Sequence, residues 1–491
     1  MLKVFKQLNS FKERIAIESE GSEFSYAQLI ERSDLIASFL LDEEKDLMEE
    51  RIGFLMSPNV DYICTLWGIW KAGGVAVPLS LSAKKSELDH YISDCEIKMI
   101  ITSDSCQQKE NIPDKNNLQI WKLEDLLLEN KRKLPDLTYE RKAMILYTSG
   151  TTNKPKGVVH THKNIEAQIS ALVEAWEWTK EDHIPLFLPL HHIHGIINSL
   201  SCPLFVGAKV TMLGAFDAEK VCSEVASKNF TVFTAVPTIY FSLIEQLENS
   251  MDSKLSEGFK KMRLMMSGSA ALAPEIHKKW KQLTGQELLE RYGMTEVGMA
   301  LSNKINGERR PGSVGVPLPG VEVRLEDDKG KTINNEGEAG QLLIKGPQVF
   351  QGYLNLPDKT KESFKDGWFI TGDVVMLERG YYKILGRDSV DIIKSGGYKI
   401  SALEIEDVLL RNDKIKECAV VGIPDDKWGE IVATAIVVKK EAIKTEEIQQ
   451  WCSSYLSDYK IPRRVEILEN LPKNSMGKIT KPELKEILKN H

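Results

Sequence analysis

The chain has 491 residues, which is long enough for one large domain and a smaller one. Hydrophobic residues make up 42% and charged residues 27%, a mixture that can bury a sizeable core and argues against disordered, collagen-like and coiled-coil proteins. The 64 Lys and Arg residues against 71 Asp and Glu residues give a net charge of −7, which supplies no general electrostatic reason to bind nucleic acid.

Several features indicate a protein of a reducing compartment that spans no membrane. The seven cysteines are scattered and include no C-x-x-C pair, so we expect free thiols. Residues 1–18 mix apolar and charged side chains, so no signal peptide is expected. The most apolar long stretch, residues 195–213, is interrupted by polar residues and by Lys209, which favours a buried core segment. We therefore expect a cytoplasmic protein.

Short β-branched apolar runs alternate with longer amphipathic stretches through the first part of the chain. This alternation predicts βαβ units in a mostly parallel sheet, the pattern of an α/β fold. The predicted strands are residues 51–55, 74–78, 98–102, 206–213, 232–236 and 262–267. The predicted helices are residues 60–71, 84–94, 218–228 and 239–247.

The pattern changes twice in the last third of the chain. From about Gly312, glycine and proline become frequent, and residues 321–325, 341–345 and 381–385 predict β-hairpins or a small β-barrel. After residues 386–389, a compact α+β unit is predicted, with helices at 403–411 and 445–456 and strands at 415–422, 432–439 and 464–468. We therefore predict a large multi-subdomain α/β body at 1–386 and a smaller α+β domain at 387–491.

The strongest local motif is residues 147–157, Tyr-Thr-Ser-Gly-Thr-Thr-Asn-Lys-Pro-Lys-Gly, which follows the apolar run 143–146. Glycines allow close backbone approach, hydroxyl groups donate hydrogen bonds to oxygen, and lysines neutralise charge, so the segment suits a polyphosphate. An ordinary polar β-turn is the alternative. The segment is not a Walker A loop, because G-x-x-x-x-G-K-[ST] is absent.

Four further segments carry candidate chemistry, although each could be an ordinary turn or helix end on its own. In residues 290–296, Thr295 and Glu296 are hard oxygen donors that could hold Mg²⁺ beside a phosphate. In residues 367–373, Asp373 could accept hydrogen bonds from ribose hydroxyls. Residues 385–399 contain glycines flanked by cations, which suggests a hinge, and residues 472–478 place Lys478 on a turn near the C-terminus.

Together, in this order and spacing, these segments strongly resemble the adenylate-forming superfamily of acyl-CoA synthetases, firefly-type luciferases and nonribosomal-peptide adenylation domains. The resemblance covers essentially the whole chain. It implies an ATP-dependent acid–thiol ligase that forms acyl-AMP and pyrophosphate and then transfers the acyl group to a thiol, usually that of CoA. The implied cofactors are ATP, Mg²⁺ and coenzyme A, and the implied partners are small molecules only.

The resemblance also implies a role for each motif residue. The β- and γ-phosphates would be bound by Thr148, Ser149, Gly150, Thr151, Thr152 and Lys156. The adenine and ribose would be bound by Gly268, Ser269, Ala270, Glu290, Arg291, Tyr292, Gly293 and Asp373, with Arg387 also at the ribose. The catalytic residues would be Lys478, Arg387, Thr295 and Glu296, with Glu296 as the Mg²⁺ ligand. The pantetheine tunnel would be lined by Gly396 and Gly397.

In this family the C-terminal domain is mobile, and residues 387–389 are the hinge candidate here. The domain would deliver Lys478 to the carboxylate and α-phosphate oxygens for adenylation and then rotate it away. The sequence around Lys478 also resembles the acetylation-regulated lysine of bacterial CoA synthetases, so acetylation is expected to remove the charge that the first step needs.

Residues 188–195, Leu-Pro-Leu-His-His-Ile-His-Gly, resemble the family's gate between the acyl pocket and the thiol tunnel, with His192 at the gate position. A metal site built from these histidines and His183 is a weaker alternative, because no cysteine lies close in sequence. Closer comparison favours the malonyl-CoA synthetase branch. The supporting stretches are residues 188–195, 202–208, 235–240, 289–300 and 307–315.

A dicarboxylate needs a cation for its distal carboxylate, and Arg291 could supply it from the pocket floor. Ser242 occupies the position where this branch usually has Arg or Lys, which leaves room for a neutral acyl tail. The expected substrate-contacting residues are His192, Arg291, Met294 and Ser242. Malonate or methylmalonate is favoured. The alternatives are a short- or medium-chain fatty acid and a stand-alone adenylation enzyme that loads a carrier protein.

Overall fold

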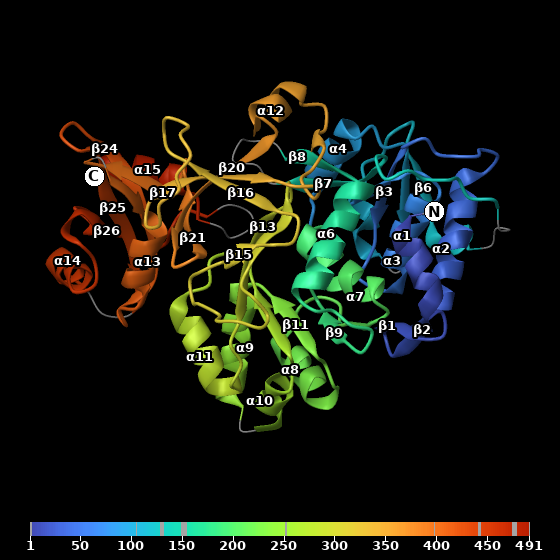
Figure 1. Cartoon of the computed structure of the whole chain (residues 1–491), viewed down its shortest axis with the longest axis horizontal. Helices are drawn as coiled ribbons and strands as arrows, with labels where there is room; N and C mark the ends of the chain where they lie inside the picture. Colours follow the sequence, from blue (N-terminus) through green and yellow to red (C-terminus); the bar gives the residue numbers. More distant parts are fainter. Residues whose placement is uncertain are drawn as a thin grey trace. The chain divides into compact units, whose positions relative to one another are not determined.

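The computed structural model describes residues 2–104, 106–127, 132–148, 155–250, 253–396, 398–439, 443–473 and 479–490. The chain divides into two compact units (Figure 1). The first contains Met1–Glu322 and Ile344–Phe369, and the second contains Val323–Leu343 and Ile370–His491. No helix within the described ranges is long and apolar enough to cross a membrane.

A seven-stranded sheet in the first unit has the order β18-β8-β7-β4-β3-β5-β6. Strands β3 (Arg51–Leu55), β4 (Val75–Pro78), β5 (Met99–Thr102), β6 (Gln119–Lys122) and β7 (Lys142–Thr148) run parallel, while β8 (Lys156–Thr161) and β18 (Gly352–Tyr353) add antiparallel pairs at one edge. The βαβ pattern predicted for residues 51–102 is confirmed, with α3 (Val60–Lys71) and α4 (Lys85–Asp94) as its helices. The predicted phosphate-binding motif begins at Tyr147 on β7, the strand at which the sheet changes from parallel to antiparallel pairing.

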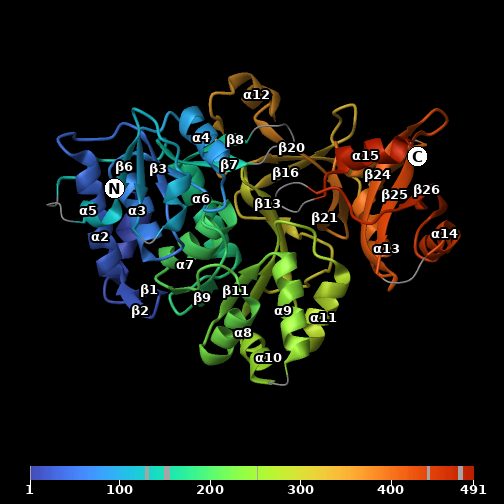
Figure 2. The same cartoon turned by 180° about the vertical axis from the view of Figure 1, so that it is seen from behind.

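A second sheet follows the order β11-β12-β13-β14-β15. Strands β11 (Val232–Ala235), β12 (Leu264–Ser267) and β13 (Leu289–Met294) are parallel, and β14 (Gly298–Ser302) and β15 (Val316–Pro317) are antiparallel to their neighbours. Helices α8 (Ala218–Ser227), α9 (Pro237–Asn249), α10 (Ser253–Lys260) and α11 (Pro274–Thr284) accompany this sheet (Figure 2). The sheets are therefore mixed, since reversed strands follow the parallel ones.

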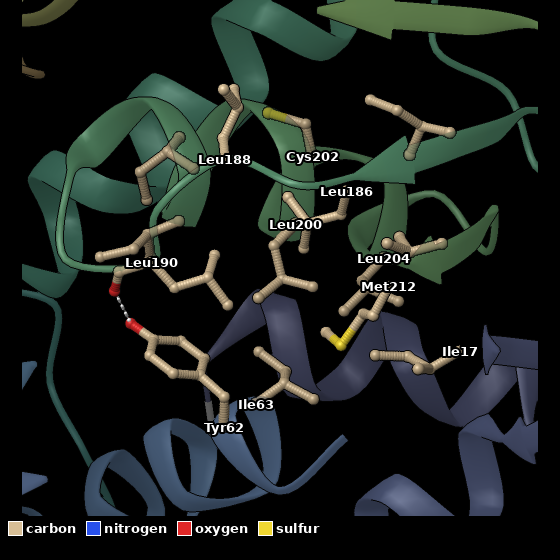
Figure 3. Packing of buried hydrophobic residues seen from close by; sticks show 14 of the residues in the cluster. Ile17, Tyr62, Ile63, Leu186, Leu188, Leu190, Leu200, Cys202, Leu204 and Met212 are labelled. Atoms are coloured by element: carbon tan, nitrogen blue, oxygen red, sulfur yellow. Dashed lines mark hydrogen bonds between the residues drawn. The ribbon is translucent and has the colours of Figure 1, made fainter. Parts of the chain in front are cut away.

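The apolar stretch at 195–213 is buried core, as predicted. It forms the π-helix η3 (His194–Ser201), the short helix α7 (Cys202–Phe205) and strand β10 (Lys209–Met212), which lies between β1 (Ile15–Ser19) and β9 (His183–Leu186) in a four-stranded sheet completed by β2 (Ser22–Ser25). Figure 3 shows part of this packing, where the Tyr62 hydroxyl donates to the Leu190 carbonyl. Lys209 pairs with Glu18 at 3.0 Å and Glu23 at 2.6 Å, which explains a lysine in this run. All seven cysteines are buried and free.

The second unit contains a five-stranded sheet, β23-β22-β25-β24 with β26 beside β25, between two helical layers. The strands are β22 (Ile392–Ser395), β23 (Tyr398–Ser401), β24 (Ile415–Asp425), β25 (Gly429–Val438) and β26 (Arg464–Ile467). Alternate strand residues face α13 (Ala402–Leu410) and α14 (Thr445–Ser453) in one apolar cluster, and α15 (Lys481–Asn490) in another. The predicted smaller α+β unit is confirmed.

The segments predicted as hairpins or a small barrel belong to a five-stranded sheet of order β16-β17-β20-β19, with β21 paired to β20. Its strands are β16 (Glu322–Glu326), β17 (Ala339–Lys345), β19 (Phe364–Lys365), β20 (Trp368–Glu378) and β21 (Tyr381–Arg387). The pairing of β20 with β21 sets Asp373 directly opposite Arg387.

Candidate active site

The ends of the predicted phosphate loop are held by a strand pair and by α4. Thr148 ends β7 and pairs with Lys156, the first residue of β8, while residues 149–154 lie outside the described part of the chain. The Tyr147 hydroxyl donates to Asp94 at 2.7 Å, and His90 Nε2 donates to the Pro155 carbonyl at 2.9 Å. Residues from one helix therefore bind both stems of the loop.

Glu296 and Lys156, two predicted site residues, both contact Tyr353. The Tyr353 hydroxyl donates to Glu296 Oε1 at 2.9 Å, and Lys156 Nζ lies 5.5 Å from the centre of the Tyr353 ring. The backbone of Glu296 is also fixed, because the Phe350 N–H donates to its carbonyl at 2.8 Å. Tyr353 therefore contacts both a buried carboxylate and the lysine predicted to bind phosphate oxygens.

The donor set near Glu296 fits Mg²⁺, which binds proteins through one or two carboxylates and completes its coordination with phosphate oxygens and waters. Thr295 precedes Glu296, and burial lowers the pKa of His160 to about 4 although the nearby Thr295 backbone opposes this shift. Within the described residues there is no group of three or more His, Cys, Asp or Glu side chains that could hold a metal ion. The histidines at 191, 192 and 194 accordingly form no such cluster there.

Arg291 lies on β13 with its guanidinium group buried. The residue is 2% exposed, its Nη2 lies 2.5 Å from His194 Nε2, and its Nη1 lies 3.5 Å from Ser269 Oγ. Gly268 allows this approach, because a Cβ there would lie 2.4 Å from Arg291 Nη1. Ser269 has a φ of 69°, a left-handed backbone conformation that non-glycine residues rarely adopt and that concentrates at functional sites.

His194 is the neutral partner of this guanidinium. Arginine can only donate, so His194 Nε2 accepts and its proton lies on Nδ1, which is 3.3 Å from Ser269 Oγ. Thr234 Oγ1 lies 2.8 Å from the same Nε2. Burial, with the nearby charge of Arg291, holds the pKa of His194 well below its ordinary value, so the ring carries no charge near neutral pH.

Arg291, His194, Ser269 and Thr234 form a group that we call the Arg291 cluster. Its one cation is buried. Among the described residues no carboxylate pairs with Arg291, and its Nε has no hydrogen-bond partner. Burial lowers the pKa of Arg291 to about 9, which still leaves the group charged at neutral pH. A buried cation without an acidic partner is unfavourable in the free protein and is a receptor for an anionic ligand.

The neighbouring residues on β13 are directed elsewhere, because side chains alternate along a strand. Glu290 accepts a hydrogen bond from the Gly312 N–H at 2.7 Å and lies 3.8 Å from His277 Nδ1, and burial raises its pKa. The Tyr292 hydroxyl lies 3.9 Å from Met294 Sδ. At Gly293 a Cβ would lie 2.1 Å from the Gly298 carbonyl oxygen, so this position requires glycine.

Three further predicted residues also lie outside the Arg291 cluster. His192 is exposed, and its ring contacts that of His191 in a tilted arrangement with ring centres 4.1 Å apart. Ser242 is half-buried on α9, where its hydroxyl donates to the Thr238 carbonyl at 3.3 Å. Ala270 is exposed.

In the second unit, Asp373 and Arg387, the two residues expected to bind the ribose, form an ion pair. Arg387 Nε lies 3.0 Å from Asp373 Oδ1, and Arg387 Nη1 donates to the Thr371 carbonyl at 2.6 Å. The Gly396 N–H donates to the Trp428 carbonyl at 2.8 Å. Gly397 and Lys478 lie outside the described residues.

Sequence reasoning missed two contacts of the site. His194 is one of three histidines in a short segment, and the segment gave no sign that it forms a π-helix, a form often found at functional sites. Tyr353 is 57 residues from Glu296 in the chain and belongs to no motif. Only the three-dimensional structure reveals these pairs.

Comparison with known proteins assigns the family. Residues 4–354 match the family model described as AMP-binding enzyme, and residues 404–478 match the AMP-binding enzyme C-terminal domain. The chain belongs to the AMP-binding enzyme family. The predicted membership in the adenylate-forming superfamily and the predicted α/β fold with a smaller C-terminal domain are both confirmed.

The enzyme is similar to named relatives over nearly its whole length. It is 39% identical to a malonate–CoA ligase of Arabidopsis thaliana, over 99% of this chain and 88% of the relative. It is 40% identical to the mitochondrial malonate–CoA ligase ACSF3 of Bos taurus, over 98% of this chain and 89% of the relative. The solved structure of ATP-bound MatB from Rhodopseudomonas palustris superposes with a TM-score of 0.88 at 33% identity and covers 99% of both chains.

Proposed function

We propose that the enzyme is an AMP-forming malonate–CoA ligase. In the first half-reaction, one carboxylate oxygen of malonate bonds to the α-phosphorus of ATP and pyrophosphate leaves. In the second, the thiol of CoA loses its proton, its sulfur bonds to the acyl carbon, and AMP leaves. The proposal is supported by the buried Arg291 guanidinium, which pairs with no carboxylate in the described part of the chain, and by the malonate–CoA ligases among the relatives.

The obstacle to the first half-reaction is the approach of an anion to an anionic phosphate. Catalysis of such a step depends on positioning and on neutralising charge. Lys156, the Thr148 hydroxyl and the residues between them would bind the terminal phosphates, and Glu296, oriented by Tyr353, would hold Mg²⁺. Bound Mg²⁺ supplies further positive charge at the phosphate oxygens. Lys478 is proposed to stabilise the charge on the α-phosphate, and Asp373 with Arg387 to bind the ribose.

The choice of acid follows from Arg291. A malonate bound by one carboxylate at the reaction centre has a second carboxylate to place, and a buried guanidinium is the strongest receptor for such a group. His194 is neutral, so its hydrogen bond orients the guanidinium group and leaves the positive charge available to a ligand. The Ser269 hydroxyl group lies beside the same guanidinium. Arg291 thus provides the cation that Ser242 lacks, which favours malonate or methylmalonate over a fatty acid with an apolar tail.

The direct test is a pyrophosphate-release screen with Mg²⁺, ATP and CoA against malonate, methylmalonate, acetate, hexanoate, decanoate and an aryl acid. We expect malonate or methylmalonate to give the highest kcat/KM. A preference for decanoate would reject the assignment of the acid and leave the ligase reaction intact. Replacing CoA by a phosphopantetheinylated carrier protein identifies the thiol acceptor, and we expect CoA to be preferred.

The compartment stays a prediction. The seven scattered cysteines, which we expect to be free thiols, favour a reducing compartment such as the cytoplasm. The Bos taurus relative, however, is named mitochondrial.

A further inference from the structure

The second unit buries three charged side chains, two of which, Lys481 and Glu406, belong to none of the motifs discussed so far. Lys481 Nζ, at the first residue of α15, lies 2.6 Å from Asp391 Oδ1 and 2.8 Å from Glu406 Oε1. The three side chains are only 11%, 15% and 16% exposed, respectively. One cation is therefore shared by two carboxylates, largely out of contact with water.

Asp391 connects this cluster to the hinge candidate at 387–389. Its Oδ2 accepts from the Arg387 N–H at 3.1 Å, and its own N–H donates to the Arg387 carbonyl at 2.8 Å. Gly386 makes room for this approach, because its φ is +134° and a Cβ there would lie 2.4 Å from Asp391 Cβ. The carboxylate that binds Lys481 is thus fixed directly to the backbone of the hinge segment.

Lys481 follows immediately after the segment that carries Lys478. The two ends of that segment are paired, since Lys473 and Ile479 form an antiparallel bridge and the Thr480 N–H donates to the Pro472 carbonyl at 2.8 Å. One residue later, Lys481 contacts the hinge-bound carboxylate. A short covalent path therefore joins residue 478 to the ammonium group of Lys481.

The cluster is not needed to attach α15 to the sheet. Leu484 and Leu488 are fully buried in the apolar cluster against β24 and β25, and Lys485 makes a second ion pair with Glu430 at 3.1 Å. Burial lowers the pKa of Lys481, but Glu406 and Asp391 raise it by more, so the ammonium group stays charged. Buried ion pairs add little net stability compared with apolar packing, and their best-attested role is to fix one arrangement.

We propose that Lys481 is a positioning residue for adenylation: through Asp391 it fixes the segment carrying Lys478 relative to the hinge segment. The proposal rests on the function proposed above for Lys478. Lys481 does not touch substrate, and its effect is exerted on the placement of the neighbouring lysine. A misplacement of about 1 Å at a reacting group can cost about 100-fold in rate.

The test compares the two half-reactions in Lys481→Met, which keeps the length of the side chain and removes its charge. We expect kcat for malonate-dependent exchange of pyrophosphate into ATP to fall about 100-fold, with KM for ATP changed less than about threefold. Thioester formation from supplied acyl-adenylate and CoA should stay within about twofold of wild type. Lys481→Arg, which keeps the charge, should recover most of the exchange rate. Lys485→Met, one turn further along α15, is the matched control and should leave both half-reactions unchanged.

Equal loss of both half-reactions in Lys481→Met, or no loss of either, overturns the proposal. Asp391→Asn gives an independent answer if Lys481→Met does not fold, because it leaves Lys481 paired with Glu406 and weakens only the link to the hinge segment. The same selective loss is expected, and an unchanged exchange rate in this variant overturns the proposal. Absence of exchange in the wild-type enzyme would instead contradict the proposed function.

Discussion

Replacing Arg291 by methionine separates a role in recognising the substrate from a role in stability. Methionine has a similar length and no charge, so the variant removes the receptor for a distal carboxylate and retains much of the volume. His194 keeps a partner, since Thr234 Oγ1 lies 2.8 Å from its Nε2 and can donate to it. The effect on malonate should therefore come from the lost charge.

The size of the effect follows from the burial of the group. Truncating one partner of a buried, hydrogen-bonded charge pair costs about 2–5 kcal/mol, and Arg291 is 2% exposed. A loss of about 3 kcal/mol corresponds to a fall of about 150-fold in kcat/KM for malonate, at 1.36 kcal/mol for each factor of ten. Propionate has no distal charge, so its kcat/KM should change less than about threefold or rise.

The assay measures pyrophosphate release at varied malonate and varied propionate for wild type, Arg291→Met and a matched control. Arg309→Met is that control, because burial also lowers the pKa of Arg309 while its Nη1 donates to the Glu287 carbonyl, outside the Arg291 cluster. The melting temperature of ligand-free Arg291→Met should be unchanged or higher, because the variant removes a buried cation without an acidic partner. Equal losses for malonate and propionate would show that Arg291 does not recognise the distal carboxylate.

Three further predictions follow from the other site residues and from one ion pair. Lys478→Ala should abolish malonate-dependent pyrophosphate exchange and largely spare thioester formation from supplied acyl-adenylate, and equal loss of both steps argues against this division of labour. A chelator of divalent cations should stop exchange, and Glu296→Gln should need a higher Mg²⁺ concentration for half-maximal exchange; an unchanged Mg²⁺ dependence rejects Glu296 as the ligand. Burial opposes ionisation of Glu18, but hydrogen bonds from Lys228 and Lys209 lower its pKa to about 2 from 4.5, so the ionised carboxylate stabilises the folded protein at pH 7. This contribution is lost as the pH falls from 4.5 towards 2, so Glu18→Gln should lower the melting temperature at pH 7, and the difference from wild type should shrink at pH 3.

The sequence predicted those parts of the fold that depend on local periodicity. The strands and helices between residues 51 and 102 were predicted within about one residue of β3, α3, β4, α4 and β5, because apolar residues recur there with a strand or helix period. The strand predicted at 206–213 is shorter in the structure, at Lys209–Met212. Residues 206–208 are equally apolar but lie in the turn after α7, and burial alone does not distinguish a turn from a strand.

Much of the site could be predicted from its motifs, and its decisive contacts could not. The motifs pointed to Glu296 and Lys156, because charged and hydroxyl-bearing residues in such segments suit Mg²⁺ and phosphate, and the resemblance to the malonyl-CoA synthetase branch pointed to Arg291. They did not reveal that His194 binds Arg291, because that contact joins residues 97 positions apart through the π-helix η3. The sequence also did not reveal where the side chain of Ser242 lies. Ser242 follows the buried Tyr240 by two positions on α9, so it lies about 200° further around the helix, on a different face.

The most direct test of the central claim is the exchange of labelled pyrophosphate into ATP by the purified wild-type enzyme with Mg²⁺ and malonate, before any thiol is added. Our account predicts rapid exchange that depends on malonate or methylmalonate and is much slower with hexanoate. If no acid in a broad panel supports exchange, the enzyme does not form an acyl-adenylate and the account is wrong.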